Sequence, residues 1–327
     1  MDLKQLIRNF IIFWGPALEI LLFPFTIISS LWMRYIRECG TERMPVSKFL
    51  FNTIGVFPIK DHYYEPHFNS KKIIGSLHNR ALPGIDLNTD EQIKLLSDFN
   101  YSDELSLFPF EKRSDNEFYF NNPRFTVGDA EILYSLIRYF KPKRVIEIGS
   151  GMSTLIASAA IEKNSYENSK YLCEHICIEP YPRRWLRNKK NINLIEKNLE
   201  TVDKSIFENL EENDILFIDS THMIKPQGDV LTEYLEILPV IAKNVIIHIH
   251  DIFTPKNYPD DWILKSVSFW NEQYMVEAIL SHSDRFKIIL ALNHLYHINK
   301  ELLESRCPAL KNNFTKEPRS LWLRKIK

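Results

Sequence analysis

The stretch RVIEIGSGMSTLIASAAI, residues 144–161, decides the fold of this chain. Residues 145–148 form a short apolar strand, residues 149–151 form a tight glycine turn, and residues 152–161 have the composition of a helix. Glycine lets the backbone approach a ligand closely, and the N–H groups at the start of a helix point toward it. The sequence therefore predicts that a nucleotide-like ligand binds at this turn.

Strand signals recur after this unit, and helical stretches such as 228–243 lie between them. Strands that alternate with helices indicate a parallel, doubly wound α/β sheet, which binds ligands at the carboxyl ends of its strands. Two late strands should pair antiparallel, because the loop 304–318 between them has no long helix. The further predicted strands are 175–180, 191–198, 214–221, 244–251, 286–292 and 320–326.

The chain divides by composition into three parts. Residues 1–50 are a hydrophobic helical segment, and residues 51–119 are a cap or connecting region with a short amphipathic helix at 90–99. Residues 120–327 are the α/β domain, which opens with a helix over 127–140 that Thr126 caps. The cap either shapes a substrate pocket or only connects the two flanking parts.

Composition excludes several classes of protein. The chain has 327 residues with 41 basic and 42 acidic side chains, so a nucleic-acid partner is not expected. The 45% of hydrophobic residues excludes a disordered chain. Cys173 and Cys177 lack a second ligand pair, so we expect reduced thiols in a reducing compartment and not a zinc site.

Residues 10–33 are apolar apart from Glu19 and are long enough to span a membrane. Pro24 lies near the middle and should kink or break a helix, which favours a broken helix that dips into one leaflet or lies along the interface. Basic residues at both ends of the run favour an anionic membrane surface. The alternative is a hydrophobic hairpin packed on the rest of the protein or at a dimer interface, and an oligomer is compatible with the sequence.

The acidic residues near the turn favour S-adenosylmethionine over NAD. Glu147 lies just before the turn, where a carboxylate repels a pyrophosphate but suits an ammonium group. Glu179 ends the second strand, where it can accept both ribose hydroxyls. Thr154 stands where the dinucleotide fingerprint has its third glycine.

Residues 120–327 resemble class I S-adenosylmethionine-dependent methyltransferases. The segments E-I-G-S-G-x-S-T, F-I-D-S-T-H and H-I-H-D-I-F-T-P are similar to the branch of macrocin-type sugar O-methyltransferases and cephalosporin-hydroxylase-like proteins. The resemblance implies the seven-stranded, Rossmann-like methyltransferase sheet. The cofactor-binding residues expected from the motifs and the resemblance are Glu147, Gly149, Ser150, Gly151, Ser153, Thr154, Glu179, Asn198 and Asp219.

The same resemblance implies a catalytic base and a metal site. His222 lies three residues after Asp219, where sugar O-methyltransferases have a base, and both are predicted to be catalytic. Asp219, His250 and Asp251 could bind Mg²⁺, although the histidine suits Mn²⁺ or Fe²⁺ better. His222 could instead cap the following segment, and Asp219 could contact only the cofactor.

The predicted acceptor is a small molecule or a lipid-linked glycan, bound at the cytoplasmic face of the membrane. We therefore expect O-methylation of a hydroxyl on a glycan or glycolipid. The alternatives are a metal-independent N-methyltransferase of a small molecule and a non-catalytic, membrane-docked protein that retains the cofactor fold. The residues predicted to line the acceptor pocket are Asp61, His62, Tyr63, Tyr64, Tyr258 and Asn271.

Overall fold

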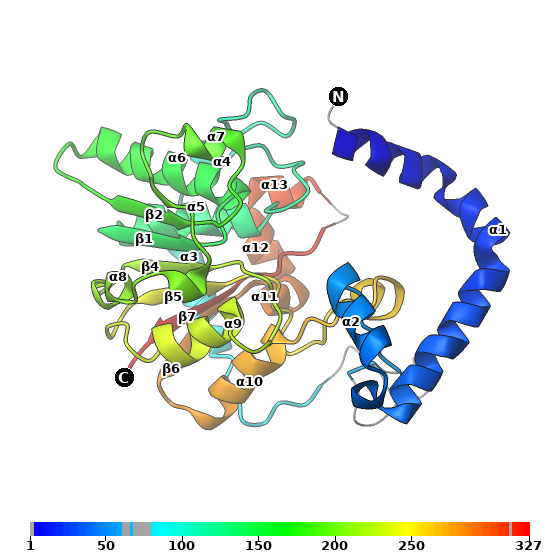
Figure 1. Ribbon diagram of the computed structural model, residues 1–327. Coiled ribbons are helices and arrows are strands. Elements are labelled where there is room, and N and C mark those ends of the chain that lie inside the picture. The colour runs from blue at the N-terminus through cyan, green and yellow to red at the C-terminus, as the bar shows by residue number, and fades with distance from the viewer. Residues whose placement is uncertain (1–2, 61–65, 68–79, 314–315) are drawn as a thin grey trace. The chain divides into compact units, whose positions relative to one another are not determined.

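The computed structural model describes residues 3–60, 66–67, 80–313 and 316–327 (Figure 1). The chain forms two compact units, Met1–Gly75 and Ser76–Lys327. The boundary falls inside the predicted connecting region 51–119. The described residues from 80 to 119 therefore belong to the same unit as the sheet.

A seven-stranded sheet of order β3-β2-β1-β4-β5-β7-β6 forms the second unit. The first five strands are parallel, and β7 runs antiparallel to both β5 and β6. The predicted doubly wound sheet and its antiparallel final pair are confirmed. The strands are β1 (Arg144–Ile148), β2 (Glu174–Ile178), β3 (Asn193–Ile195), β4 (Ile215–Ile218), β5 (Ile246–Ile249), β6 (Phe286–Ala291) and β7 (Leu321–Lys325).

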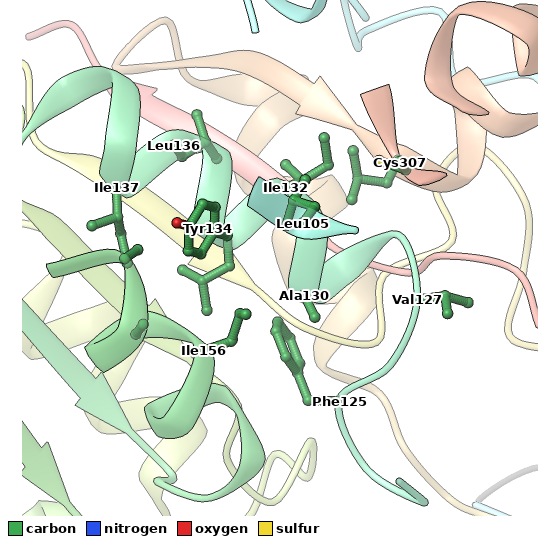
Figure 2. Packing of buried hydrophobic residues seen from close by; sticks show 14 of the residues in the cluster. Leu105, Phe125, Val127, Ala130, Ile132, Tyr134, Leu136, Ile137, Ile156 and Cys307 are labelled. Atoms are coloured by element: carbon green, nitrogen blue, oxygen red, sulfur yellow. The ribbon is translucent and has the colours of Figure 1, made fainter. Parts of the chain in front are cut away.

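Apolar clusters cover both faces of this sheet. In β4, Phe217 belongs to one cluster and the next residue, Ile218, belongs to the other. Helices α5 (Asp129–Phe140) and α6 (Met152–Glu167) contribute to the first cluster, part of which Figure 2 shows. Because both faces are buried, the central strand β4 is a continuous apolar run, as is usual in parallel sheets.

Short helices make up most of the remaining structure. Helix α3 (Thr89–Ser97) confirms the predicted amphipathic helix, since Leu96 and Phe99 are buried. The others are α4 (Ser102–Leu105), α7 (Arg184–Arg187), η3 (Leu199–Thr201), α8 (Ser205–Glu208), α9 (Asp229–Thr232), η4 (Glu233–Ile237), η5 (Asp261–Lys265), α10 (Glu272–His282), α11 (Leu292–Ile298), α12 (Lys300–Arg306) and α13 (Pro308–Lys311).

Two predicted helices differ from the structure. Helix α5 has Gly128 and not Thr126 at its N-cap. The left-handed φ of 76° at Gly128 is not helical, so the helix begins at the next residue. Glu131 accepts a hydrogen bond from the Gly128 N–H at 2.9 Å. The predicted helix 228–243 is the short α9 followed by the π-helical turn η4.

The first unit consists of α1 (Leu3–Cys39), η1 (Thr41–Arg43) and α2 (Pro45–Ile54). Of the two predicted effects of Pro24, a kink or a break, the break is wrong, because both Pro16 and Pro24 lie inside α1. Each proline removes one N–H donor, and the hydrogen bonds of neighbouring turns can still hold the helix together. Figure 1 shows α1 as a continuous, curved helix.

The apolar side chains of α1 are exposed. Residues 8–39 are long and apolar enough to cross a membrane by length and composition, and none of the most apolar window is buried in the described structure. Phe13 and Ile20 are 76% and 79% exposed. The predicted alternative of a hydrophobic hairpin therefore does not describe α1, which is a single helix.

Candidate active site

The glycine turn lies where the strand order reverses between β1 and β4, the place where such sheets bind ligands. Gly149 has a φ of 80°, and a Cβ added there would lie 1.9 Å from the backbone oxygen of Asp219. Glycine is therefore required for the ends of β1 and β4 to meet. At Gly151, by contrast, an added Cβ would meet no described atom within 4 Å, and this residue lines a cavity.

Two adjoining cavities surround this turn. The first has a volume of 580 Å³, and the second has a volume of 430 Å³. Both are lined by Gly149, Glu179 and Asp219, and Asn198 lines the second. The structure thus brings most of the predicted site residues together. Those that line the first cavity are Gly149, Ser150, Gly151, Ser153, Glu179, Asp219, His222, His250 and Asp251.

Glu147 lies beneath the turn, not in the cavity lining. Its side chain is fully buried, and its Oε2 accepts hydrogen bonds from Ser153 at 3.0 Å and Thr154 at 2.8 Å. Its Oε1 lies 2.6 Å from Nε2 of His175. The predicted contact of Glu147 and Thr154 with the cofactor therefore needs correction: their side chains bond to each other and hold the turn from below.

Glu147 and His175 also form a buried group with Cys177 that has the side-chain types of a metal site. The short contact between Glu147 and His175 already joins two of its members without an ion. All four cysteines are free in the described residues, as the sequence predicted.

His222 stands in the wall of the first cavity between three carboxylates. Its Nδ1 lies 2.7 Å from Oε2 of Glu272, and its Nε2 lies 3.4 Å from Asp219 and 3.5 Å from Asp251. Burial lowers the pKa of His222, but the hydrogen bonds with Asp219 and Glu272 outweigh it and raise the pKa well above its usual value. Tyr234 donates to Oε1 of Glu272 at 2.7 Å and fixes that carboxylate.

His250 faces a different set of carboxylates. Its Nδ1 lies 3.3 Å from Asp219, and its Nε2 lies 3.6 Å from Asp129 at the start of α5. Burial lowers the pKa of His250, but Asp251 and Asp219 outweigh this effect and raise it to about 10. The imidazole is therefore protonated at neutral pH and balances the charge of these carboxylates.

The group that could hold a cation is Asp219, His222 and Asp251, whose ligand atoms lie within 4.8 Å of one another. This corrects the predicted metal set, because His222 takes the place of His250. An imidazole that donates Nδ1–H to a carboxylate and turns Nε2 toward the ion is the usual arrangement of a histidine ligand. Arg319 opposes a cation here, since its Nε lies 2.9 Å from Oδ1 of Asp251.

Two residues of this group have unusual backbone conformations. His222 has a φ of 59° and Asp251 has a φ of 58°, both in the left-handed region that residues other than glycine rarely adopt. Such strain tends to gather at functional sites, where the surrounding structure holds it in place. The ligand atoms of both side chains lie within 4.8 Å of that of Asp219.

An aromatic wall, Trp262 and Trp270, borders the first cavity. Their rings lie 5.0 Å apart, and the Trp270 ring lies 4.5 Å from His222. The Arg319 guanidinium lies 5.4 Å from the centre of the Trp262 ring. The tryptophans, Arg319 and Asp129 were not among the predicted site residues, because no local motif marks them.

The predicted acceptor residues are placed elsewhere. The hydroxyl of Tyr258 is buried and accepts a hydrogen bond from the Gln273 N–H at 3.0 Å. Oδ1 of Asn271 accepts from the Ile224 N–H at 2.7 Å. Neither lines the first cavity, so both shape the loops around it instead. Asp61, His62, Tyr63 and Tyr64 lie outside the described residues.

Comparison with known proteins identifies a methyltransferase domain in this chain. Residues 146–252 match a family described as a methyltransferase domain. An uncharacterized protein of Archaeoglobus fulgidus is 36% identical over 174 residues, which cover 48% of this chain and 75% of that protein.

Similar solved structures include an S-adenosylmethionine-dependent methyltransferase from Archaeoglobus fulgidus (15% identical, 60% of this chain and 94% of that chain, TM-score 0.32). Another is a TDP-rhamnose 3'-O-methyltransferase of calicheamicin biosynthesis (12% identical, 78% and 98%, TM-score 0.36). A third is a protein-L-isoaspartate O-methyltransferase from Plasmodium falciparum in complex with S-adenosyl-L-homocysteine (16% identical, 50% and 82%, TM-score 0.30). At these TM-scores the likenesses carry no argument about the substrate.

The sheet order and the match to the methyltransferase domain make the chain an S-adenosylmethionine-dependent methyltransferase. It belongs to the same family as the archaeal protein.

Proposed function

We propose that this enzyme methylates a hydroxyl group of a glycan or glycolipid, with His222 as the base. The observation that carries the proposal is the orientation of His222. Its Nδ1 bonds to Glu272, and its Nε2 lies among the carboxylates at the wall of the first cavity. Such a pair fixes the ring and leaves Nε2 to accept a proton.

The two cavities fit the halves of the cofactor. The open space above Gly151 accommodates the methionine part beside the turn. Glu179 borders both cavities, where its carboxylate can accept the ribose hydroxyls, and Asn198 lines the second cavity for the adenine edge. Glu147 supports this site by holding Ser153 and Thr154.

The reaction requires a proton acceptor beside the attacking oxygen. The acceptor oxygen bonds to the methyl carbon, the carbon–sulfur bond breaks, and the electron pair stays on the now neutral sulfur. His222 takes the hydroxyl proton, and Glu272 stabilises the resulting imidazolium. Because the same carboxylates raise the pKa of His222, the neutral imidazole that accepts the proton becomes more populated as the pH rises, and turnover should increase with pH.

The side-chain types of the same residues suit a divalent cation, although Arg319 pairs with one of them, Asp251. Asp219, His222 and Asp251 would hold it, and two oxygen ligands with one nitrogen suit Mn²⁺ better than Mg²⁺. When bound, the ion would lower the pKa of the acceptor hydroxyl. His222 as a ligand and His222 as a base are alternative roles for the same nitrogen.

The surroundings of the site support a glycan acceptor near a membrane. Trp262 and Trp270 offer apolar ring faces beside charged groups, the combination that suits a sugar. Helix α1 has the length and composition to enter a bilayer. The proposed location is the cytoplasmic face of the membrane.

Calorimetry with S-adenosylhomocysteine tests the cofactor site of the full chain in detergent, with and without Mg²⁺ or Mn²⁺. We expect micromolar binding, and binding that changes with the ion would support the Asp219, His222 and Asp251 site. The variants His222→Gln and Asp219→Asn should bind the product but lose turnover in a screen of glycans and glycolipids. A well-folded protein that binds no product, or variants with unchanged turnover, would overturn the proposal.

The ion pair between Arg319 and Asp251 favours a second candidate, metal-independent N-methylation of a small molecule. The guanidinium supplies Asp251 with the positive charge that a metal would bring. Turnover of an amine that does not depend on added metal would identify this activity. Turnover of a hydroxyl acceptor supports the first candidate.

A further inference from the structure

A third cavity, of 530 Å³, adjoins the first on the side away from the glycine turn. Pro123, Trp262 and Arg319 line both, so the two cavities are immediate neighbours. The residues of the glycine turn do not line the third cavity. It therefore belongs to the acceptor side of the site and not to the cofactor.

Three residues with cationic side chains line this third cavity: Lys256 from the loop after β5, and Lys316 and Arg319 from the segment before β7. Glu317 and Asp260 are its acidic residues. The Glu317 carboxylate is already engaged, because its Oε2 lies 2.9 Å from Nε2 of His297. With three cationic and two acidic side chains, the lining keeps a net positive charge, which suits an anionic group.

The positive charge of the Lys316 ammonium group is not fully balanced by the groups around it. Its Nζ donates to the neutral backbone oxygen of Asn122 at 3.2 Å. Burial and the nearby Arg319 lower the pKa of Lys316. A bound anion would relieve both effects by supplying the missing negative charge.

Asn293 adds a polar recognition group to the same cavity. Only 2% of its surface is exposed, and its Nδ2 donates to Glu317 at 3.0 Å and to the Pro318 backbone oxygen at 3.1 Å. Its Oδ1 is buried and has no hydrogen-bond partner among the described residues. Since unsatisfied buried acceptors are costly, Oδ1 is suited to a hydroxyl or N–H group of a ligand.

We propose that the third cavity binds a phosphate or diphosphate group of the acceptor, with Lys256, Lys316 and Arg319 contacting the anion. Trp262 then separates this group from the sugar hydroxyl that faces His222. This inference rests on the proposed function, because it assigns the cavity to the substrate of that reaction. It narrows the acceptor to a sugar that carries a phosphate ester or diphosphate.

Calorimetry with inorganic pyrophosphate tests the cavity in the full chain. We expect binding that weakens at least about 10-fold in the double variant Lys256→Gln, Lys316→Gln. Lys300→Gln is the matched control, since Lys300 lies in α12 and pairs with Glu304. Binding that is absent, or equal in the double variant and the control, would overturn the inference.

Two further probes distinguish the sources of the phosphate. Uridine diphosphate represents a nucleotide-linked sugar, and farnesyl diphosphate in detergent micelles represents a lipid-linked one. Tighter binding of either probe than of pyrophosphate, lost in the double variant, supports the site and identifies its source. Titration of S-adenosylhomocysteine into the same samples tests the proposed function separately from the phosphate site. If the cofactor product binds and no diphosphate binds, only the assignment of the third cavity is overturned.

Discussion

Nδ1 of His222 lies 2.7 Å from Oε2 of Glu272, a residue 50 positions further along the chain. Glu272 is the first residue of α10, is fully buried, and is held on its other oxygen by Tyr234. The pair fixes both the ring orientation and the tautomer of His222, whether Nε2 accepts a proton or binds a cation.

Replacement of Glu272 by Gln should lower turnover about 10- to 100-fold, the usual effect of losing a group that orients a functional histidine. The amide keeps the volume but loses the charge that stabilises the imidazolium. Steady-state kinetics with calorimetry of S-adenosylhomocysteine would check this, because cofactor affinity should stay unchanged. Glu301→Gln, at an exposed position of α12, is the control, and equal turnover in both variants would contradict the role of Glu272.

The two glycines of the turn should respond differently to alanine. In Gly149→Ala the new Cβ would overlap the Asp219 backbone oxygen, so the variant should be strongly destabilised or fail to fold. In Gly151→Ala the Cβ would enter the open space of the first cavity, so the variant should fold but bind S-adenosylhomocysteine more weakly. Thermal unfolding and calorimetry separate the two effects. Wild-type cofactor affinity in a folded Gly151→Ala variant would argue against the placement of the methionine part.

Stability should fall as the pH rises through the titration of Glu131. Burial raises the pKa of Glu131 to about 7 and outweighs the three backbone N–H groups that bond to it. The folded state thus holds this proton more tightly than the unfolded state. The stabilisation that protonated Glu131 gives the folded state is complete below about pH 4.5 and is lost as the pH passes 7.

The free energy of unfolding should therefore decrease by up to about 3 kcal/mol between pH 4.5 and pH 8 because of this group. Thermal unfolding of wild type and Glu131→Gln over that range measures the contribution as the difference between the two curves. Parallel curves would show that Glu131 titrates with an ordinary pKa.

Charges placed on α1 should release the enzyme from membranes. Leu21 and Ile28 are 71% and 66% exposed and lie seven residues apart on one face of the helix. In the variant Leu21→Lys, Ile28→Lys, flotation with anionic lipid vesicles should be strongly reduced. Tyr166→Lys, at an 86% exposed position of α6, controls for added charge. Flotation that is equal in both variants, or absent in wild type, would contradict membrane association.

Local sequence determined the framework of the protein. Glycine at 149 and 151, apolar runs on both sides and a following helix specify one strand–turn–helix unit, since each feature acts over a few residues. The alternation of such units predicted the sheet and placed Asp219, His222 and Asp251 at its carboxyl edge, where they line the first cavity. Local helix preference predicts a break at Pro24, but the helix continues through it. The hydrogen bonds of neighbouring turns can sustain a helix that one proline weakens.

Only the tertiary structure decided how these residues divide their roles. Whether Glu147 faces a ligand or the turn depends on the hydroxyls of Ser153 and Thr154 and on His175 from the next strand. The pairing of His222 with Glu272 depends on where α10 packs, which no local pattern encodes. Short-range geometry determines which residues stand at the end of a strand, so local sequence predicts them. The hydrogen-bond partners of these residues come from segments far apart in the chain, and only long-range packing brings the two together.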